Sequence, residues 1–320
     1  MVAKLTDVAE LAGVSPTTVS RVINNKGYLS DKTKQKVQEA MRTLGYKPNN
    51  LARGLQGKSA QLIGLIFPNI SNIFYSELIE YLEIELFKHG YKTIICNSEN
   101  DPAKEREYIE MLEANQVDGI ISSSHNLGID DYERVSAPII AFDRNLAPNV
   151  PIVASDNFEG GKLAARTLQK NGCENIIMIT GHDNTDSPTE LRALGFTFQI
   201  PHGEVFKVPN NLSTIRREME IKSIIARTRP DGIFVSDDLT AILTMKIAKQ
   251  LDLKIPEDLK IIGYDGTSFI ENFFPQLTTI RQPIDEIASL LVDILLKRIK
   301  GEKTSKDYIL PNSLLPGSSI

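Results

Sequence analysis

The chain has 320 residues, 41% of them hydrophobic, and is therefore long enough for two or three packed domains that need no disulfide or metal to be stable. Its two cysteines, Cys96 and Cys173, match neither a disulfide framework nor the spacing of metal ligands, which favours a reducing compartment. No apolar run approaches the ~18 residues of a membrane span, and the first residues do not follow the pattern of a signal peptide. The sequence therefore predicts a cytoplasmic protein without a cofactor, a metal or a membrane contact.

Charge is distributed unevenly along the chain. Residues 1–60 carry ten basic and four acidic side chains, a net charge of +6, whereas the other 260 residues carry −11. Affinity for phosphates comes from clustered lysine and arginine side chains. A basic N-terminal segment on an acidic body indicates that only the first segment binds a polyanion.

The first 46 residues are typical of a helix-turn-helix unit. Apolar residues recur at helical spacing in three short runs, Val8–Leu11, Thr17–Ile23 and Thr33–Leu44. Between the first two runs, Gly13 allows a tight turn and Ser15 can cap the second helix. This is the arrangement that places a helix in a DNA major groove.

The second of these helices carries the candidate base contacts. Pro16, Thr17 and Ser20 lie on its N-terminal half and can reach base edges or phosphates, whereas Val19 belongs to the core. Arg21 is the strongest candidate for a guanine contact, because its planar guanidinium can donate two parallel hydrogen bonds to one guanine edge.

From Gln61 onward, apolar β-rich runs alternate with amphipathic helices, which is typical of parallel sheets covered on both faces. The predicted fold class of the body is therefore α/β, with doubly wound parallel sheets. The predicted strands are Leu62–Pro68, Lys92–Asn97, Gly119–Ser123, Ile139–Phe142, Ile152–Ala154, Ile176–Thr180, Glu204–Val208, Gly232–Ser236, Lys260–Tyr264 and Thr278–Arg281. The predicted helices include Ser76–His89, Ala103–Asn115, Glu159–Lys170, Leu212–Thr228, Thr240–Leu251 and Ile284–Lys300.

The body contains a faint internal repeat. Val117–Ile121 leads to Ile139–Asp143, and Pro230–Phe234 leads in the same way to Ile261–Asp265. Two similar doubly wound lobes bind a ligand in the cleft between them, at the carboxyl ends of their strands. The aspartates that end these strands are therefore expected to face a cleft.

Residues Leu5–Asn24 have the sequence LTDVAELAGVSPTTVSRVIN, which resembles the headpiece of the LacI/GalR family of bacterial transcription repressors. The resemblance continues through Gly45–Asn49 and Leu51–Leu55, and then over nearly the whole body. Within the family, the chain is most similar to the sucrose operon repressors of Gram-positive bacteria, above all along Asn69–Ser76 and Asp118–Asn145. The function that this implies is repression of a sugar utilisation operon, relieved by a small sugar effector.

The resemblance also implies a hinge whose helices form on DNA, where Leu55 of each copy wedges into the minor groove. An apolar wedge unstacks a base step and bends the duplex, although an ordinary linker leucine is the alternative. The implied domains are a DNA-binding headpiece at 1–46, a hinge helix at 47–58, and an effector-binding and dimerisation domain at 59–320, with an N-lobe at about 60–156 and 281–310 and a C-lobe at about 157–280. The candidate DNA contacts are Thr6, Ser15, Pro16, Thr17, Thr18, Ser20, Arg21, Asn24, Asn49, Leu51, Ala52 and Leu55.

Polar side chains lie at the ends of several predicted strands, together with aromatic ones. Carboxylate, guanidinium and amide groups suit a polyol, because its hydroxyls both donate and accept while its C–H faces pack on rings. The alternative for each aspartate is an ordinary helix cap. By resemblance, the candidate effector contacts are Asn72, Phe74, Asp143, Arg144, Asp156, Arg192, Asp237, Asp265 and Gln282.

The chain departs from the family pattern after Gly195-Phe196. The family usually continues a full helix at this point, whereas Gln199–Gly203 contains a proline and a glycine that interrupt it within a few residues. The effect of the shortened segment 197–211 on the C-lobe pocket, and on Arg192, stays open.

Other classes of function fit the sequence less well. An enzyme is not predicted, because the chain has no nucleophile elbow, no P-loop and no dinucleotide fingerprint. A solute receptor for a transporter would need an export signal and would not carry a helix-turn-helix.

The predicted partners are operator DNA, a small sugar and a second copy of the chain, since one recognition helix reads only half of a site. Arg144 and Arg192 beside three aspartates suit fructose or sucrose better than a sugar phosphate. A phosphorylated carrier-protein co-repressor, which some relatives bind, stays open, as does the sign of regulation.

Overall fold

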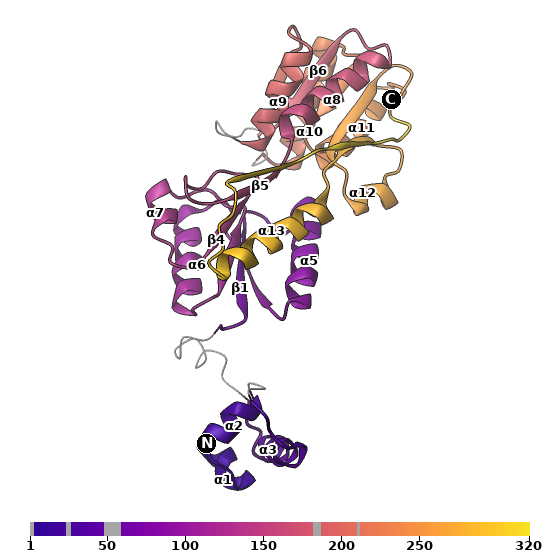
Figure 1. Cartoon of the computed structure of the whole chain (residues 1–320). Helices are drawn as coiled ribbons and strands as arrows, with labels where there is room; N and C mark the ends of the chain where they lie inside the picture. The colour runs from indigo at the N-terminus through magenta and orange to yellow at the C-terminus, as the bar shows by residue number, and fades with distance from the viewer. Residues whose placement is uncertain (1–2, 24–26, 48–58, 182–186, 210–211) are drawn as a thin grey trace. The chain divides into compact units, whose positions relative to one another are not determined.

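The computed structural model describes residues 3–23, 27–47, 59–181, 187–209 and 212–320. The chain divides into two compact units, Met1–Ala60 and Gln61–Ile320 (Figure 1). Within the described part, no helix is both long and apolar enough to cross a membrane, and no group of three or more His, Cys, Asp or Glu side chains is placed to hold a metal ion.

The N-terminal unit is a three-helix bundle. Gly13 ends its first helix with a φ of 66°, a left-handed conformation that glycine adopts without strain. The Ser15 hydroxyl accepts a hydrogen bond from the Thr18 N–H at 3.2 Å, so Ser15 caps the second helix as predicted. The helices are α1 (Leu5–Ala12), α2 (Pro16–Ile23) and α3 (Asp31–Leu44).

One small apolar core holds these three helices together. Val8, Val19 and Val37 are fully buried, one from each helix, and the small side chains of Ala9 and Ala40 let the helices approach closely. Val19 fixes which side of α2 faces inward, so the opposite side of α2 faces solvent.

The N-lobe of the body is a six-stranded parallel sheet in the order β11-β5-β4-β3-β1-β2. Helices α5 and α13 cover one face, around a core that includes Leu65 and Leu291, and helices α6 and α7 cover the other, around Leu112 and Tyr132. The strands are β1 (Leu62–Phe67), β2 (Lys92–Asn97), β3 (Gly119–Ser122), β4 (Ile139–Phe142), β5 (Ile152–Ser155) and β11 (Asp307–Leu310). The helices are α5 (Ile73–Lys88), α6 (Pro102–Ala114), α7 (Ile129–Glu133) and α13 (Ile284–Ile299).

The C-lobe repeats this plan with the sheet order β12-β10-β9-β8-β6-β7. Helices α10, α11 and α12 pack on one face, and α8 and α9 pack on the other, around Leu168 and Phe196. The strands are β6 (Ile176–Thr180), β7 (Val205–Lys207), β8 (Gly232–Val235), β9 (Lys260–Asp265), β10 (Thr278–Arg281) and β12 (Ser313–Leu315). The helices are α8 (Asn157–Lys170), α9 (Pro188–Gln199), α10 (Thr214–Thr228), α11 (Asp238–Gln250) and α12 (Ser268–Phe273).

The chain passes between the two lobes three times, after β5, after β10 and after β11 (Figure 1). The three connections are tied together: Asp156 N–H donates to the Leu310 carbonyl at 2.8 Å, and Ser155 Oγ donates to Gln282 Oε1 at 2.6 Å. Two of the strands involved, β11 and β12, were not predicted from the sequence. Strand β12 runs antiparallel to β10 and adds residues 313–315 to the C-lobe sheet.

The predicted fold class is confirmed, because a helical headpiece precedes a two-lobed α/β body whose sheets are parallel except for β12. Continuous apolar strands such as β6 and β8 are buried on both faces, which is why their sequences do not alternate.

Candidate functional site

The solvent-facing side of α2 presents the predicted DNA-contacting residues of the headpiece. Pro16, Thr17 and Arg21 are exposed, while Thr18 and Ser20 are half-buried. Among the other candidates, Thr6 on α1 and Ser15 before α2 are exposed. Asn24, Asn49, Leu51, Ala52 and Leu55 lie outside the described residues.

A cleft of about 390 Å³ lies between the two lobes of the body. Eight of the nine predicted effector residues line it: Asn72, Phe74, Asp143, Arg144, Arg192, Asp237, Asp265 and Gln282. The ninth, Asp156, does not, because its carboxylate accepts the Glu159 N–H at 2.9 Å and caps α8. The cap, which was the alternative for every aspartate, is therefore what the structure shows for Asp156.

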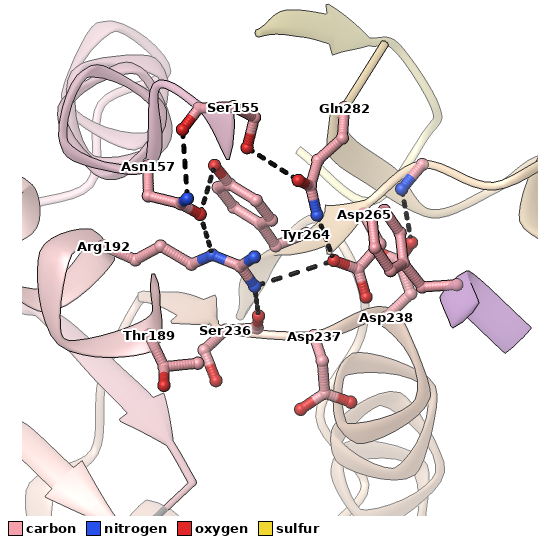
Figure 2. A network of polar contacts seen from close by, with 12 residues as sticks. Ser155, Asn157, Thr189, Arg192, Ser236, Asp237, Asp238, Tyr264, Asp265 and Gln282 are labelled. Atoms are coloured by element: carbon pink, nitrogen blue, oxygen red, sulfur yellow. Dashed lines mark hydrogen bonds and ion pairs between the residues drawn. The ribbon is translucent and has the colours of Figure 1, made fainter. Parts of the chain in front are cut away.

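Arg192 is the centre of a buried polar network in this cleft (Figure 2). Its Nε donates to Asn157 Oδ1 at 2.8 Å, and its Nη1 donates to the Ser236 carbonyl at 2.6 Å. Nη1 also lies 3.6 Å from Asp265 Oδ1, and the guanidinium carbon lies 3.7 Å from the centroid of the Tyr264 ring. Contacts on every side fix the orientation of this guanidinium.

The network continues to both aspartates that end the repeated strands. Gln282 Nε2 donates to Asp265 Oδ1 at 2.8 Å, and Asn157 Nδ2 donates to Asp143 Oδ1 at 2.8 Å. Because Asn157 contacts both Arg192 and Asp143, it links the C-lobe to the N-lobe. We call Asp143, Asn157, Arg192, Asp265 and Gln282 the inner network.

The backbone is strained at both aspartates of the inner network. Asp143 has a φ of 62° and Asp265 has a φ of 119°, conformations that residues with a side chain rarely adopt. The loop after Asp265 is held by Asp238, whose Oδ2 accepts the Gly266 N–H at 2.8 Å. Such outliers persist where surrounding contacts enforce them, and they cluster at ligand sites.

Burial controls the charge of these carboxyls. It raises the pKa of Asp143 to about 6 and that of Asp265 to about 7, although the Arg192 charge lowers both. Burial also raises the pKa of Asp238, and the neighbouring Asp265 raises it further. An empty cleft therefore disfavours the ionised carboxylates, which a ligand that donates hydroxyl groups would stabilise.

Two glycines determine where Arg192 lies. A Cβ on Gly161 of α8 would lie 2.0 Å from the Arg192 carbonyl oxygen, and a Cβ on Gly195 of α9 would lie 2.0 Å from the Phe158 carbonyl oxygen. Backbones can approach this closely only where both helices carry glycine. The close approach brings the guanidinium of Arg192 under Tyr264 and into the cleft.

The sequence left open whether the shortened segment 197–211 alters the C-lobe pocket, and this segment begins in α9, the helix that carries Arg192. Helix α9 extends through Gln199, and the chain then reaches β7 at Val205. Arg192 lies well inside the helix, and both Pro188 and Thr189 at its start line the cleft. The interruption therefore falls beyond the part of α9 that faces the cleft.

The N-lobe wall supplies a mixed polar and aromatic surface. Asn72 Oδ1 accepts the Phe74 N–H at 2.9 Å and so caps α5, while the Phe74 ring stacks on Phe142 at 5.8 Å. Arg144 Nη1 lies 2.8 Å from His125 Nε2. Because a guanidinium only donates, this nitrogen must accept, which keeps His125 neutral in this contact.

Several residues of the cleft were not predicted. Asn157 and Tyr264 complete the inner network and its packing, yet Asn157 was passed over for the neighbouring Asp156, which has the same sequence signal. The other lining residues that sequence reasoning missed are Pro68, Asn69, Ser71, Tyr75, Asn100, Pro188, Thr189, Arg217, Ser236 and Leu239.

Comparisons with known proteins agree with this geometry. A family model of bacterial regulatory proteins, the lacI family, matches residues 4–49, and a periplasmic binding protein-like domain matches residues 165–320. The chain is 74% identical over 320 residues, which is all of both chains, to a sucrose operon repressor of Streptococcus mutans serotype c.

Solved structures agree as well. A periplasmic binding protein/LacI transcriptional regulator from Alkaliphilus metalliredigens, complexed with D-xylulofuranose, is 32% identical, with a TM-score of 0.73, and the match covers 81% of this chain and 99% of that one. The lac repressor dimer bound to operator and an anti-inducer is 25% identical, with a TM-score of 0.85, and the match covers 100% of this chain and 99% of that one.

A helix-turn-helix headpiece joined to a two-lobed body with a polar cleft defines a ligand-responsive DNA-binding regulator. The chain belongs to the LacI family of bacterial transcription regulators, as its sequence predicted.

Proposed function

We propose that this protein is a sequence-specific transcription repressor of a sugar utilisation operon, most directly one for sucrose, and that a small sugar releases it from its operator. It acts by binding and not by catalysis. The observation that carries this function is the combination, in one chain, of a helix-turn-helix headpiece and a cleft that contains the inner network. The 74% identity with a sucrose operon repressor over the whole chain supports the choice of operon.

The headpiece, residues 1–46, binds operator DNA through α2. Arg21 is exposed on α2, and Val19 on the same helix is buried, so α2 can enter a major groove with its apolar side still packed. The hinge, residues 47–58, binds the minor groove, with Leu55 as the wedge between base steps. Two copies of the chain act together, since two headpieces read the two halves of an operator.

The sugar binds in the cleft between the lobes. Asp143 and Asp265 accept hydrogen bonds from sugar hydroxyls, while Arg192 and Gln282 donate to sugar oxygens. The Phe74 ring packs against a C–H face. The relative complexed with D-xylulofuranose supports a furanose in this cleft, as in fructose or the fructosyl half of sucrose.

The sugar releases DNA by favouring one arrangement of the two lobes over another. Asn157, Asp143 and Gln282 join residues of both lobes to one network, so an occupied cleft holds the lobes differently from an empty one. A coupling free energy of about 1–3 kcal/mol between the two sites changes operator affinity about 5- to 150-fold. In this proposal the sugar acts as an inducer, because the arrangement that it favours binds the operator more weakly.

Titration of the full-length protein against DNA from upstream of a sucrose utilisation gene tests this function. At a stated, near-physiological salt concentration, the protein is expected to bind this DNA at least about a thousandfold more tightly than a scrambled duplex. Fructose, sucrose or one of their phosphate esters is then expected to weaken the specific binding. Equal affinity for both duplexes would contradict the repressor function.

A further inference from the structure

The C-lobe wall of the cleft carries a third guanidinium, that of Arg217 on α10. Arg217 Nη2 donates to Thr240 Oγ1 at 2.5 Å, while its buried Nε has no acceptor among the residues that the structure describes. A guanidinium has five N–H donors, so the described residues leave most of the donor capacity of Arg217 unused.

Of the other two guanidinium groups of the cleft, Arg192 lies against a carboxylate, whereas Arg144, like Arg217, contacts a neutral group. Arg192 is held by Asn157, the Ser236 carbonyl and Asp265, and Arg144 is held by His125. Arg217 is held by a neutral hydroxyl and forms no ion pair with a carboxylate of the described residues. Its positive charge is therefore available to a ligand.

Asp237, which lines the same cleft, and Glu218, which follows Arg217 in the sequence, already have other partners. Asp237 accepts the Thr240 N–H at 2.8 Å and the Thr240 hydroxyl at 2.7 Å. Glu218, the next residue on α10, forms an ion pair with Lys246 of α11. Neither carboxylate neutralises Arg217 directly.

A second donor lies in the same part of the cleft. The Ser236 hydroxyl is buried, lines the cleft and has no hydrogen-bond partner among the described residues. Ser236 immediately precedes Asp237, and its carbonyl contacts Arg192 (Figure 2), so it adjoins the inner network in the same cleft that Arg217 lines. A buried hydroxyl without a partner costs free energy that a bound acceptor would recover.

The charge of the cleft also favours an anion. Three carboxyls and three guanidinium groups line it. Because burial raises the pKa of Asp143 to about 6 and that of Asp265 to about 7, these two carboxyls are partly protonated near neutral pH. The guanidinium groups keep their full charge, so protonation of either carboxyl leaves an excess of positive charge in the cleft.

We propose that the effector is a sugar phosphate, and that Arg217 and the Ser236 hydroxyl bind its phosphate while the inner network holds the sugar hydroxyls. A phosphate presents several acceptor oxygens that match the fork of a guanidinium. This inference rests on the proposed function and names the effector class for the same cleft. It reverses the preference for a neutral sugar, which counted Arg144 and Arg192 but not Arg217.

Calorimetric titration of the full-length protein tests the assignment. The probes are fructose, fructose 6-phosphate, sucrose, sucrose 6-phosphate, glucuronate and inorganic phosphate, used on the wild type and on R217Q and R217K. Arg216→Gln serves as the matched control, because Arg216 is an exposed arginine next to Arg217 on the same helix and does not line the cleft.

We expect a phosphate ester to bind the wild type about tenfold or more tightly than its parent sugar, since a hydrogen bond to a charged group contributes on that scale. R217Q is expected to bind the ester and its parent sugar with equal affinity. R217K should keep part of the preference for the ester, and R216Q should keep all of it. Loss of both affinities in equal proportion in R217Q would show that Arg217 only supports the fold.

Three further outcomes separate this inference from the proposed function. A parent sugar that binds as tightly as its phosphate ester would overturn the phosphate assignment and leave the sugar-responsive repressor intact. Tighter binding of glucuronate than of both esters would also overturn it. If no sugar and no ester binds, the proposed effector function fails together with the inference.

Discussion

The headpiece and the cleft of this protein are built on opposite principles. The headpiece exposes its candidate recognition residues, such as Thr17 and Arg21, on one short helix over a small apolar core. The cleft buries or half-buries its polar residues and draws them from the end of β4, from β9, α8 and α9, and from the connection after β10. Recognition by the headpiece therefore depends on a few local side chains, whereas recognition by the cleft depends on how distant elements pack.

Removal of Arg192 should have the largest effect in the cleft. In Arg192→Met, Asp143 and Asp265 lose the charge that offsets their burial, and breaking such a buried network costs about 3–5 kcal/mol. We expect effector affinity to fall more than about a hundredfold by calorimetry. Affinity for operator DNA without effector should stay near that of the wild type. A parallel loss of DNA binding would contradict the claim that the cleft binds the effector while the headpiece binds DNA.

A substitution at the contact between α8 and α9, away from the ligand, should also lower effector affinity. In Gly195→Ala the new methyl group must displace the backbone of Phe158, which is expected to lower the free energy of unfolding by about 1–3 kcal/mol. Because α9 carries Arg192, effector affinity should fall as well. Gly128→Ala is the control, since its methyl group would have only Asp131 nearby, at 3.9 Å. An unchanged effector affinity in Gly195→Ala would mean that the approach of α8 and α9 does not position Arg192.

Arg21→Ala tests the local character of the headpiece. Loss of one bidentate base contact costs about 1–3 kcal/mol, so operator affinity should fall about 5- to 150-fold in a DNA titration at fixed salt. Effector affinity and the melting temperature of the body should not change. Arg216→Ala, which removes an exposed arginine of the body, should leave operator affinity unaltered.

The titration of Asp143 and Asp265 should make the cleft sensitive to pH. In the folded protein the pKa values of about 6 and about 7 lie above the value of about 3.9 for a free aspartate. The stability that the two protonated carboxyls contribute is therefore complete below about pH 3.9 and is lost as the pH rises through 6 and 7. The melting temperature of the ligand-free protein should fall from pH 5 to pH 8, and less steeply in D143N and D265N. Affinity for a neutral sugar should rise severalfold over the same range, because hydroxyl groups bind the ionised carboxylates. A flat profile in the wild type would show that the pKa values of these carboxyls are not raised.

Asp156→Ala should have the smallest effect. Loss of the cap of α8 should lower the free energy of unfolding by about 1 kcal/mol. Effector affinity should be unchanged, because Asp156 does not line the cleft. A large loss of affinity would restore Asp156 to the effector site that the sequence had predicted.

The headpiece depends on local residues and the cleft on the packing of distant elements, and this difference decides how much of each region the sequence could predict. The helix-turn-helix is encoded by local signals such as Gly13 and Ser15, and its helices were predicted from spacing alone. Asp143 and Asp265 could be predicted because parallel strands end at one edge of a sheet. Asp156 and Asn157 could not be told apart, because both follow β5 and only the packing of α8 decides which side chain turns inward.

Other parts of the cleft depend entirely on tertiary structure. Arg217 lies one turn before the buried Ile221 on the same face of α10, and its contact with Thr240 in the cleft depends on how α10 packs against α11. Strands β11 and β12 are short and partly exposed, and they form because the third connection between the lobes runs beside the other two. Neither feature has a local pattern that a sequence could show.

The most direct measurement compares how an effector changes operator affinity in the wild type and in Arg192→Met. We predict that the effector that binds the cleft weakens operator binding of the wild type about 5- to 150-fold, while Arg192→Met binds the operator normally and does not respond. An equal response in both proteins, or no response in the wild type, would contradict control of the headpiece by the cleft.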